Sequence, residues 1–340
     1  MGSDGDLAIH PTGLLGGMRW WLEALLRAVG AEVPDPTSAD RTGFDAGKGE
    51  TGGLDPASVI FDATGYRRRF RLTLGEKTIE AAHVENTKLP SKRHPVIGPD
   101  GQPVLDSSGQ PKTKVPEWFF KSSPVAGSVA LRITPLHKEF DVALISDLLG
   151  FMAKWGALGA RAQMGFGVVK ITGGETNGDA LSEFLTKHKG SHGGQGLPAL
   201  HQMFFARVAC RQPGTLLTAE HTFLLKYDIR RLFNGDDALR HHIMGWVQPK
   251  SEHRIGAKIH MSRPYRGNST LRLWGWVPDL SLQGQERHRE RDVLQKIFSY
   301  FSSGPFRLES WREWNSARDP NRDGESRVDF FDRLRKEPWQ

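Results

Sequence analysis

The chain has 340 residues, a length for which two domains are expected. It carries 46 Lys and Arg against 39 Asp and Glu, a net charge of +7, so nucleic acid is the first partner class to test. The single cysteine, Cys210, excludes a disulfide framework and a cysteine-based zinc site. No apolar run reaches the roughly 18 residues of a membrane span, and MGSDGDLAIH lacks the pattern of a signal peptide, so we expect a soluble, cytoplasmic protein without a membrane segment.

The stretch TGLLGGMRWWLEALLRAVG predicts a first helix with its N-cap at Thr12. Its apolar stripe comprises Leu15, Met18, Leu22, Leu25, Leu26 and Val29. Trp20 falls on the opposite side with Glu23 and Arg27, where a surface helix is normally polar, so we expect something to cover it.

Two interpretations of this helix remain open. The glycines Gly16 and Gly17 let a ligand come close, and the free N–H groups at the helix start together with Arg19 suit an anion. Alternatively, Arg19 pairs with Glu23 one turn on, and Trp20 packs under a second domain.

A glycine- and proline-rich loop separates this helix from YRRRFRLTL, residues 66–74, a predicted strand with a basic, wet face that carries Arg67 and Arg68. An irregular, proline-broken insertion follows near 85–118. The remaining predicted elements of this half are a strand at 128–134, a helix from a cap at Asp141 to Trp155, a glycine-punctuated loop and a strand at 168–172.

Residues 176–200 read as a polar linker rich in Gly and His. The same order then recurs: strands at 203–211, 257–261, 270–278 and 306–310, with helical pieces at 226–233 and 238–247 and a helix at 290–301. We therefore predict an α+β fold of two tandem ferredoxin-like (RRM-like) βαββαβ domains, residues 1–175 and 201–340, the first without a full first strand and the second with a charged C-terminal extension.

The loop GALGARAQMGFG fits no dinucleotide fingerprint, because its glycines have the wrong spacing and it follows a helix instead of a strand. No P-loop motif occurs in the chain. Gly159 and Gly165 allow close approach of a polyanion, Arg161 adds charge, and Phe166 offers a stacking face. A plain connector between helix and strand is the alternative, and four glycines in a dozen residues favour binding.

The second basic stretch, HRIGAKIHMSRPYRG, places Arg254, Lys258, Arg263 and Arg266 around a strand, with Tyr265 nearby. Cations with an interleaved aromatic residue suit single-stranded RNA, whose phosphates attract charge and whose bases stack. A solvated strand edge protected by its charges explains the same pattern equally well.

Metal or cofactor chemistry has little support, since no pair of histidines has the H-x-x-x-H spacing with a partnering carboxylate. We expect no catalytic residues, no metal and no cofactor. The alternative is a metal-independent endoribonuclease that processes guide RNA, for which His260 with Arg263 or Tyr265 could serve as acid and base.

Six stretches in this order resemble the first RAMP-superfamily subunit of the Cmr effector complex in type III-B CRISPR systems: PTGLLGGMRWWLEALLRAVG, ATGYRRRFRL, GALGARAQMGFG, LKYDIRRLF, RIGAKIHMSRPYR and LRLWGWVP. They span Thr12 to Pro278, and the combination of the G-x-x-R-W-W helix with the W-G-W-x-P strand is the most specific part. Another capping or backbone RAMP subunit is a further alternative.

The resemblance implies two ferredoxin-like domains in a non-catalytic subunit that holds the 3′ part of the crRNA beside other RAMP subunits and helps capture target RNA. It also implies that Arg19, Arg161 and Phe166 face RNA while Trp20 and Trp21 brace the helix. The chain departs from the family pattern in two ways: only about a dozen residues precede the helix, and SVIFDATGYRRRF has no cysteine.

Overall fold

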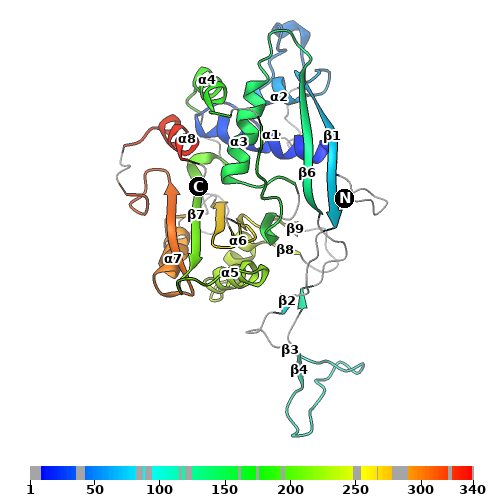
Figure 1. The fold of residues 1–340 in the computed structure, drawn as a ribbon, viewed down its shortest axis with the longest axis vertical. Coiled ribbons are helices and arrows are strands. Elements are labelled where there is room, and N and C mark those ends of the chain that lie inside the picture. Colours follow the sequence, from blue (N-terminus) through cyan, green and yellow to red (C-terminus); the bar gives the residue numbers. More distant parts are fainter. Residues whose placement is uncertain are drawn as a thin grey trace.

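The computed structural model describes residues 9–35, 43–81, 87–88, 94–114, 117–118, 125–159, 162–173, 176–192, 196–247, 254–265, 267–277, 290–320 and 324–338. Within these residues the chain forms a mixed α+β fold with antiparallel sheets, as predicted from the sequence. Figure 1 shows a compact body from which a long arm projects.

The N-terminal half contributes helices α1 (Pro11–Ala28), α2 (Pro56–Phe61) and α3 (Ala143–Trp155) and strands β1 (Phe70–Ala81) and β6 (Val125–Pro135). The two strands form an antiparallel ribbon with an irregularity between Leu74 and Lys77. Leu72 is buried at the foot of the ribbon, whereas most of its outer part is exposed.

The strand predicted at 168–172 is wrong. A strand needs a hydrogen-bonded neighbour, and the described chain gives this segment none. The nearest pairing is a single parallel bridge from Gly165, in the preceding loop, to Ser262. In its described part, the first unit therefore keeps the second and third strands of a βαββαβ unit, which pair with each other, and lacks the first and fourth.

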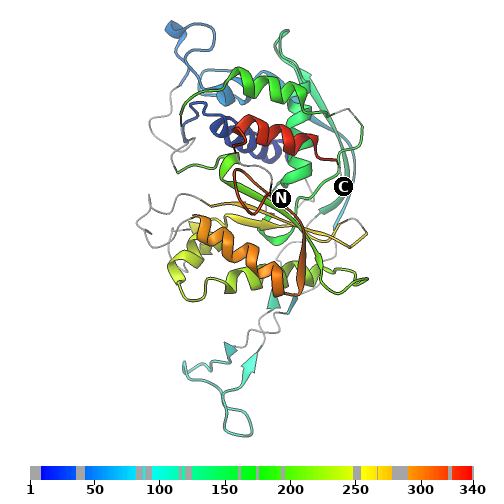
Figure 2. The same cartoon turned by 90° about the vertical axis from the view of Figure 1, so that its left-hand side faces the viewer.

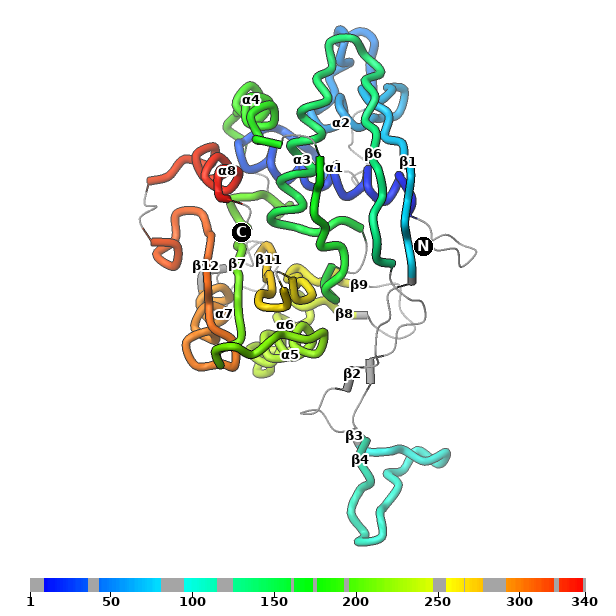
Figure 3. The backbone as a smooth tube through the Cα atoms, viewed as in Figure 1, coloured from blue at the N-terminus to red at the C-terminus, as the bar shows by residue number. Residues whose placement is uncertain are grey.

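The insertion forms the projecting arm (Figures 1 and 3). In the arm, β2 (Thr87–Lys88) pairs with β5 (Glu117–Trp118), and β3 (His94–Pro95) pairs with β4 (Thr113–Lys114). All side chains at 99–114 are exposed, so the tip of the arm contributes nothing to either core.

The C-terminal half contributes β7 (Met203–Cys210), α5 (Ala219–Arg231), α6 (Asp237–Met244), the short pair β8 (Trp246–Val247) and β9 (Arg254–Ile255), β10 (Ile259–Met261), β11 (Leu271–Trp276), α7 (Glu290–Ser303) and β12 (Phe306–Glu313). Its sheet has the order β10-β11-β7-β12, with every neighbouring pair antiparallel. This connection of strands and helices is the predicted βαββαβ unit, and the prediction is confirmed here.

Strand β7 is buried on both faces and separates two cores. Phe204 and Val208 point into the core formed with α5, α6 and α7, whereas Met203 and Phe205 belong to the core of the N-terminal half. Alternating side chains on a strand face opposite ways, so a single run of apolar residues serves both cores. Figure 2 shows helices on both sides of this sheet.

Two helices from later in the chain, one in its middle and one near its end, pack on the core of the N-terminal half. Helix α4 (Asp179–Lys187) lies inside the segment predicted to be a linker and buries Leu181 and Leu185 completely. Helix α8 (Arg327–Lys336), in the predicted extension, buries Leu334, whose backbone carbonyl accepts a hydrogen bond from Trp155 Nε1 at 3.0 Å. The placement of the domain boundaries stays a prediction, but neither segment is a bare linker or tail.

Helix α1 is more deeply buried than its pattern predicts. Glu23 and Arg27, expected on the outer side, are 3% and 2% exposed. Arg27 donates to the carbonyls of Val33, Pro34 and Pro198, so the segment after α1 and the segment between α4 and β7 cover that face. Trp20, at 36%, is the aromatic residue of α1 that stays exposed.

Candidate nucleic-acid interface

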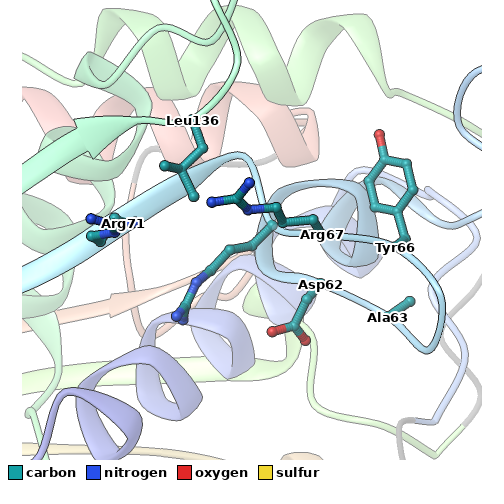
Figure 4. A pocket seen from close by; sticks show the side chains of 7 residues that line it. Asp62, Ala63, Tyr66, Arg67, Arg71 and Leu136 are labelled. Carbon is teal, nitrogen blue, oxygen red and sulfur yellow. The ribbon is translucent and has the colours of Figure 1, made fainter.

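A hollow of about 400 Å³ lies at the foot of the β1–β6 ribbon. We call it the arginine hollow. It is lined by Asp62, Ala63, Tyr66, Arg67, Arg68, Arg71 and Leu136. They come from the turn after α2, the start of β1 and the residue after β6, as Figure 4 shows.

The turn that builds the hollow is held by its own backbone. Ala63 and Tyr66 exchange hydrogen bonds, with N···O distances of 3.2 and 2.9 Å. Gly65 within this turn has φ +81°, a conformation that favours glycine. The turn is followed by three consecutive arginines, and the Arg69 N–H donates to the Ile60 carbonyl of α2 at 3.1 Å before the chain enters β1.

The arginines of this run differ sharply in their partners. Arg69 donates to Tyr66 Oη and approaches Glu50 at 3.3 Å. Within the described part of the chain, the side chains of Arg67, Arg68 and Arg71 make neither a hydrogen bond nor an ion pair. Three arginines without a protein partner in the described chain therefore line one hollow, which makes it a candidate site for an anion.

The ribbon extends this basic surface. Thr73 pairs with Arg132 and Arg71 pairs with Thr134, which places both arginines on the same exposed face of the ribbon. Sequence reasoning had named Arg67 and Arg68 but not Arg71, Arg132 or Asp62. Strand alternation opposite the buried Phe70 and Leu72 was the signal that could have identified Arg71.

Arg19 lies beside the hollow but is engaged by the fold. Its Nε donates to Glu23 Oε1, its Nη2 to Ser58 Oγ and its Nη1 to the Asp62 carbonyl, each at 2.8 Å. These contacts favour the alternative in which Arg19 is structural, and contact of Arg19 with RNA stays a prediction. Arg27 Nη2 holds the other oxygen of Glu23 at 3.2 Å, so the carboxylate is clamped by two arginines.

The glycines of α1 leave space in front of the helix. A side chain at Gly16 would meet nothing within 4 Å, and one at Gly17 would meet only Met152 Cε at 3.9 Å. The fold therefore does not require glycine at either position. Approach of a ligand to this surface stays a prediction.

A second cluster joins two of the predicted stretches. Gly165 has φ +88°, and its carbonyl accepts a hydrogen bond from the Arg263 backbone N–H at 3.1 Å. The Arg263 guanidinium lies over the Phe166 ring, 4.8 Å from its centroid. Burial lowers the pKa of Arg263, and among the described residues its Nε and Nη2 find no acceptor. Phe166 therefore stacks on a cation of the protein itself.

The other residues predicted to bind RNA near this cluster differ in their surroundings. Gly159 has φ +83° and an open space in front of it, whereas Arg161 and Arg266 lie outside the described residues. Arg254 occupies β9 opposite Val247. Lys258 Nζ donates to the His242 carbonyl at 2.7 Å, and burial lowers its pKa to about 8. Described contacts join Arg19 to the arginine hollow, and none joins the hollow to Arg263.

His260 is poorly suited to acid–base chemistry. It is largely buried and stacks on Trp274 with ring centroids 5.6 Å apart. Burial, with a smaller contribution from Lys226, lowers its pKa to about 4, so the ring is neutral at pH 7.

Among the described residues, no group of three His, Cys, Asp or Glu side chains could hold a metal ion. No helix in the described part is long and apolar enough to cross a membrane.

Comparison with known proteins gives a match to a family model and a weak likeness to a solved structure. Residues 2–170 match the family model of the RAMP superfamily. The crystal structure of apo Cmr1 from Pyrococcus furiosus aligns with a TM-score of 0.38 and 14% identity, over 87% of this chain and 89% of that one. No curated protein matches the chain.

Proposed function

We propose that this chain, whose residues 2–170 match the family model of the RAMP superfamily, is a non-catalytic RNA-binding subunit of a type III-B CRISPR ribonucleoprotein. In this proposal it acts in the cytoplasm beside other RAMP subunits, holds the 3′ part of the crRNA and helps capture target RNA. The resemblance of its motifs, from Thr12 to Pro278, to the first RAMP subunit of the Cmr complex supports this role.

The observation that carries RNA binding is the arginine hollow. Protein acceptors would satisfy arginines that serve the fold, as they satisfy Arg19 and Arg69. Arg67, Arg68 and Arg71 have no such acceptors in the described chain and line one concave surface. The sugar–phosphate backbone of RNA would supply the missing acceptors, because guanidinium groups bind phosphate in a bidentate way.

The second cluster supports an RNA path that includes the C-terminal half. Arg263 keeps two nitrogens, Nε and Nη2, without an acceptor in the described part of the chain, while its guanidinium lies over Phe166. An ordered guanidinium with free donors is suited to a phosphate or a base edge once the surrounding side chains open. Gly165 brings the backbone of the glycine loop against this same arginine.

The proposal is tested by incubating the purified protein with labelled CRISPR repeat RNA in EDTA. We expect retention of RNA on a filter without cleavage, because His260 is held neutral and largely buried. Specific cuts in EDTA that disappear in the His260→Ala variant would establish the guide-processing nuclease instead.

A matched charge series separates specific from general attraction. The triple variant of Arg67, Arg68 and Arg71 to Gln should bind RNA weakly. A control triple variant, Lys187, Lys189 and Lys296 to Gln, removes the same charge from exposed positions elsewhere and should bind like the parent protein. Equal losses in both variants would mean that net charge, and not the arginine hollow, attracts the RNA.

A further inference from the structure

Asp62 is the acidic residue among those that line the arginine hollow, and the other charged residues of its lining are arginines (Figure 4). Its backbone adopts φ 119° and ψ 161°. This region of backbone conformation is essentially restricted to glycine, because a Cβ clashes with the neighbouring peptide groups. A side chain at this position is therefore retained at the expense of backbone strain.

The fold holds Asp62 through its backbone and needs little from its carboxylate. The Asp62 N–H donates to the Ser58 carbonyl at 3.0 Å and ends α2, and the Asp62 carbonyl accepts from Arg19 Nη1 at 2.8 Å. Glycine would make both bonds without strain. The carboxylate lies 3.6 Å from Arg19 Nη1, and the side chain is 58% exposed, which indicates a weak ion pair.

A carboxylate also works against the binding of phosphate by Arg67, Arg68 and Arg71, because it repels the same anion. It becomes favourable only when a hydrogen-bond donor of the ligand reaches it. Single-stranded RNA offers two kinds of donor: the N–H groups of some bases and the 2′-hydroxyl of every ribose. A subunit that holds guides of varied sequence requires the donor that every nucleotide carries.

We infer that Asp62 accepts a hydrogen bond from a ribose 2′-hydroxyl while the arginines of the hollow bind the flanking phosphates. Asp62 thereby selects RNA against DNA at this position. The inference rests on the proposed function, since it assigns a specificity residue to the same RNA site. The hollow, at about 400 Å³, is at the small end of ligand sites and suits one nucleotide of a single strand.

The test compares three single strands of identical sequence: RNA, DNA and 2′-O-methyl RNA, the last keeping an oxygen at the 2′ position but no donor. The parent protein should bind RNA about tenfold more tightly than either of the others, the effect of one hydrogen bond to a charged group. In Asp62→Gly the RNA affinity should fall and the DNA affinity should stay or rise, because the repulsive carboxylate is gone. The variant should then bind RNA and DNA with about equal affinity.

Two controls keep the result interpretable. Asp62→Gly should melt at the same or a higher temperature than the parent, since it removes the strained conformation, so lost selectivity cannot come from unfolding. Asp237→Asn, at an exposed carboxylate on α6, removes the same charge away from the hollow and should keep the full preference for RNA.

An equal preference for RNA in the parent and in Asp62→Gly would overturn the inference, as would equal binding of the three strands by the parent. If the strands bind equally yet depend on the three arginines, the proposed function survives and the role of Asp62 alone fails. If the parent protein binds no nucleic acid, both fail.

Discussion

Replacing Arg19 with Ala should destabilise the protein even though Arg19 lies outside the apolar stripe of α1. The side chain joins α1 to Ser58 of α2 and to the carbonyl of Asp62. Arg19 is also one of the two arginines that form ion pairs with Glu23, a residue that is 3% exposed. After the replacement, Arg27 at 3.2 Å is the remaining ion-pair partner of Glu23 among the described residues.

The magnitude follows from these contacts. Removing one partner of a buried ion pair costs about 3–5 kcal/mol when the other charge is left alone. Arg27 keeps Glu23 paired, so the cost is closer to the loss of charge-assisted hydrogen bonds, about 2–3 kcal/mol in total. For domains of this size each kcal/mol corresponds to roughly 2–4 °C. We therefore expect the melting temperature to fall by about 5–10 °C.

Thermal melting followed by far-ultraviolet circular dichroism measures this directly. Arg67→Ala is the matched control, because it removes the same charge from the neighbouring hollow without breaking a contact, and it should melt like the parent. If Arg19→Ala melts like Arg67→Ala and instead loses RNA affinity, the structural role of Arg19 is refuted and Arg19 belongs to the RNA surface.

Two further predictions concern pH and the arm. His260 is neutral in the folded protein, where its pKa is about 4, and titrates near about 6.5 when unfolded, so the unfolded state binds the extra proton between these values. As the pH drops from about 6.5 to 4, His260 alone should lower the free energy of unfolding by about 2–3 kcal/mol, and His201 and His242, whose pKa values burial also lowers to about 4, should add to the loss. Urea titrations at both ends of this range measure the loss, and a His260→Asn variant that loses as much stability as the parent would contradict the assignment. Replacing residues 94–114 by a short Gly-Ser linker should leave the melting temperature unchanged, because the described side chains of the tip are almost all exposed; a drop of several degrees would show that the arm supports a core.

The order of elements could be predicted from the sequence because local patterns determine it. The strands around Phe204, Ile259, Leu273 and Phe306 carry apolar residues in short runs bounded by turn signals, and the structure confirms their βαββαβ connection. The strand expected at 168–172 had the same local pattern, but strand formation depends on a neighbour that sequence alone does not provide.

The other differences between the sequence predictions and the structure arise where segments distant in the sequence cover a residue. Glu23 and Arg27 follow the polar side of a helix by periodicity, yet they are buried because residues near Pro198 and Val33 reach over them. Leu334 lies in a charged stretch that gives no sign of where α8 packs. Such contacts join residues far apart in the chain, so no local pattern contains them.

The candidate site was predictable to a similar degree. Composition and spacing identified Arg67, Arg68 and Arg263 as basic residues next to aromatics. They did not reveal which arginines the fold itself satisfies, and this distinction separates Arg19 and Arg69 from the unpaired residues of the hollow. The strain at Asp62 is a property of the backbone and has no signature in the residue type.

The salt dependence of RNA binding tests the central claim, that the arginine hollow holds the RNA backbone, most directly. Log affinity for a single strand should fall linearly with log salt concentration, with a slope of about −0.7 for each phosphate neutralised. Replacing Arg67, Arg68 and Arg71 by Gln should make the slope shallower by about 2, as expected for three lost phosphate contacts. An unchanged slope in the triple variant, with RNA still bound, would contradict the claim and place the RNA on another surface of the protein.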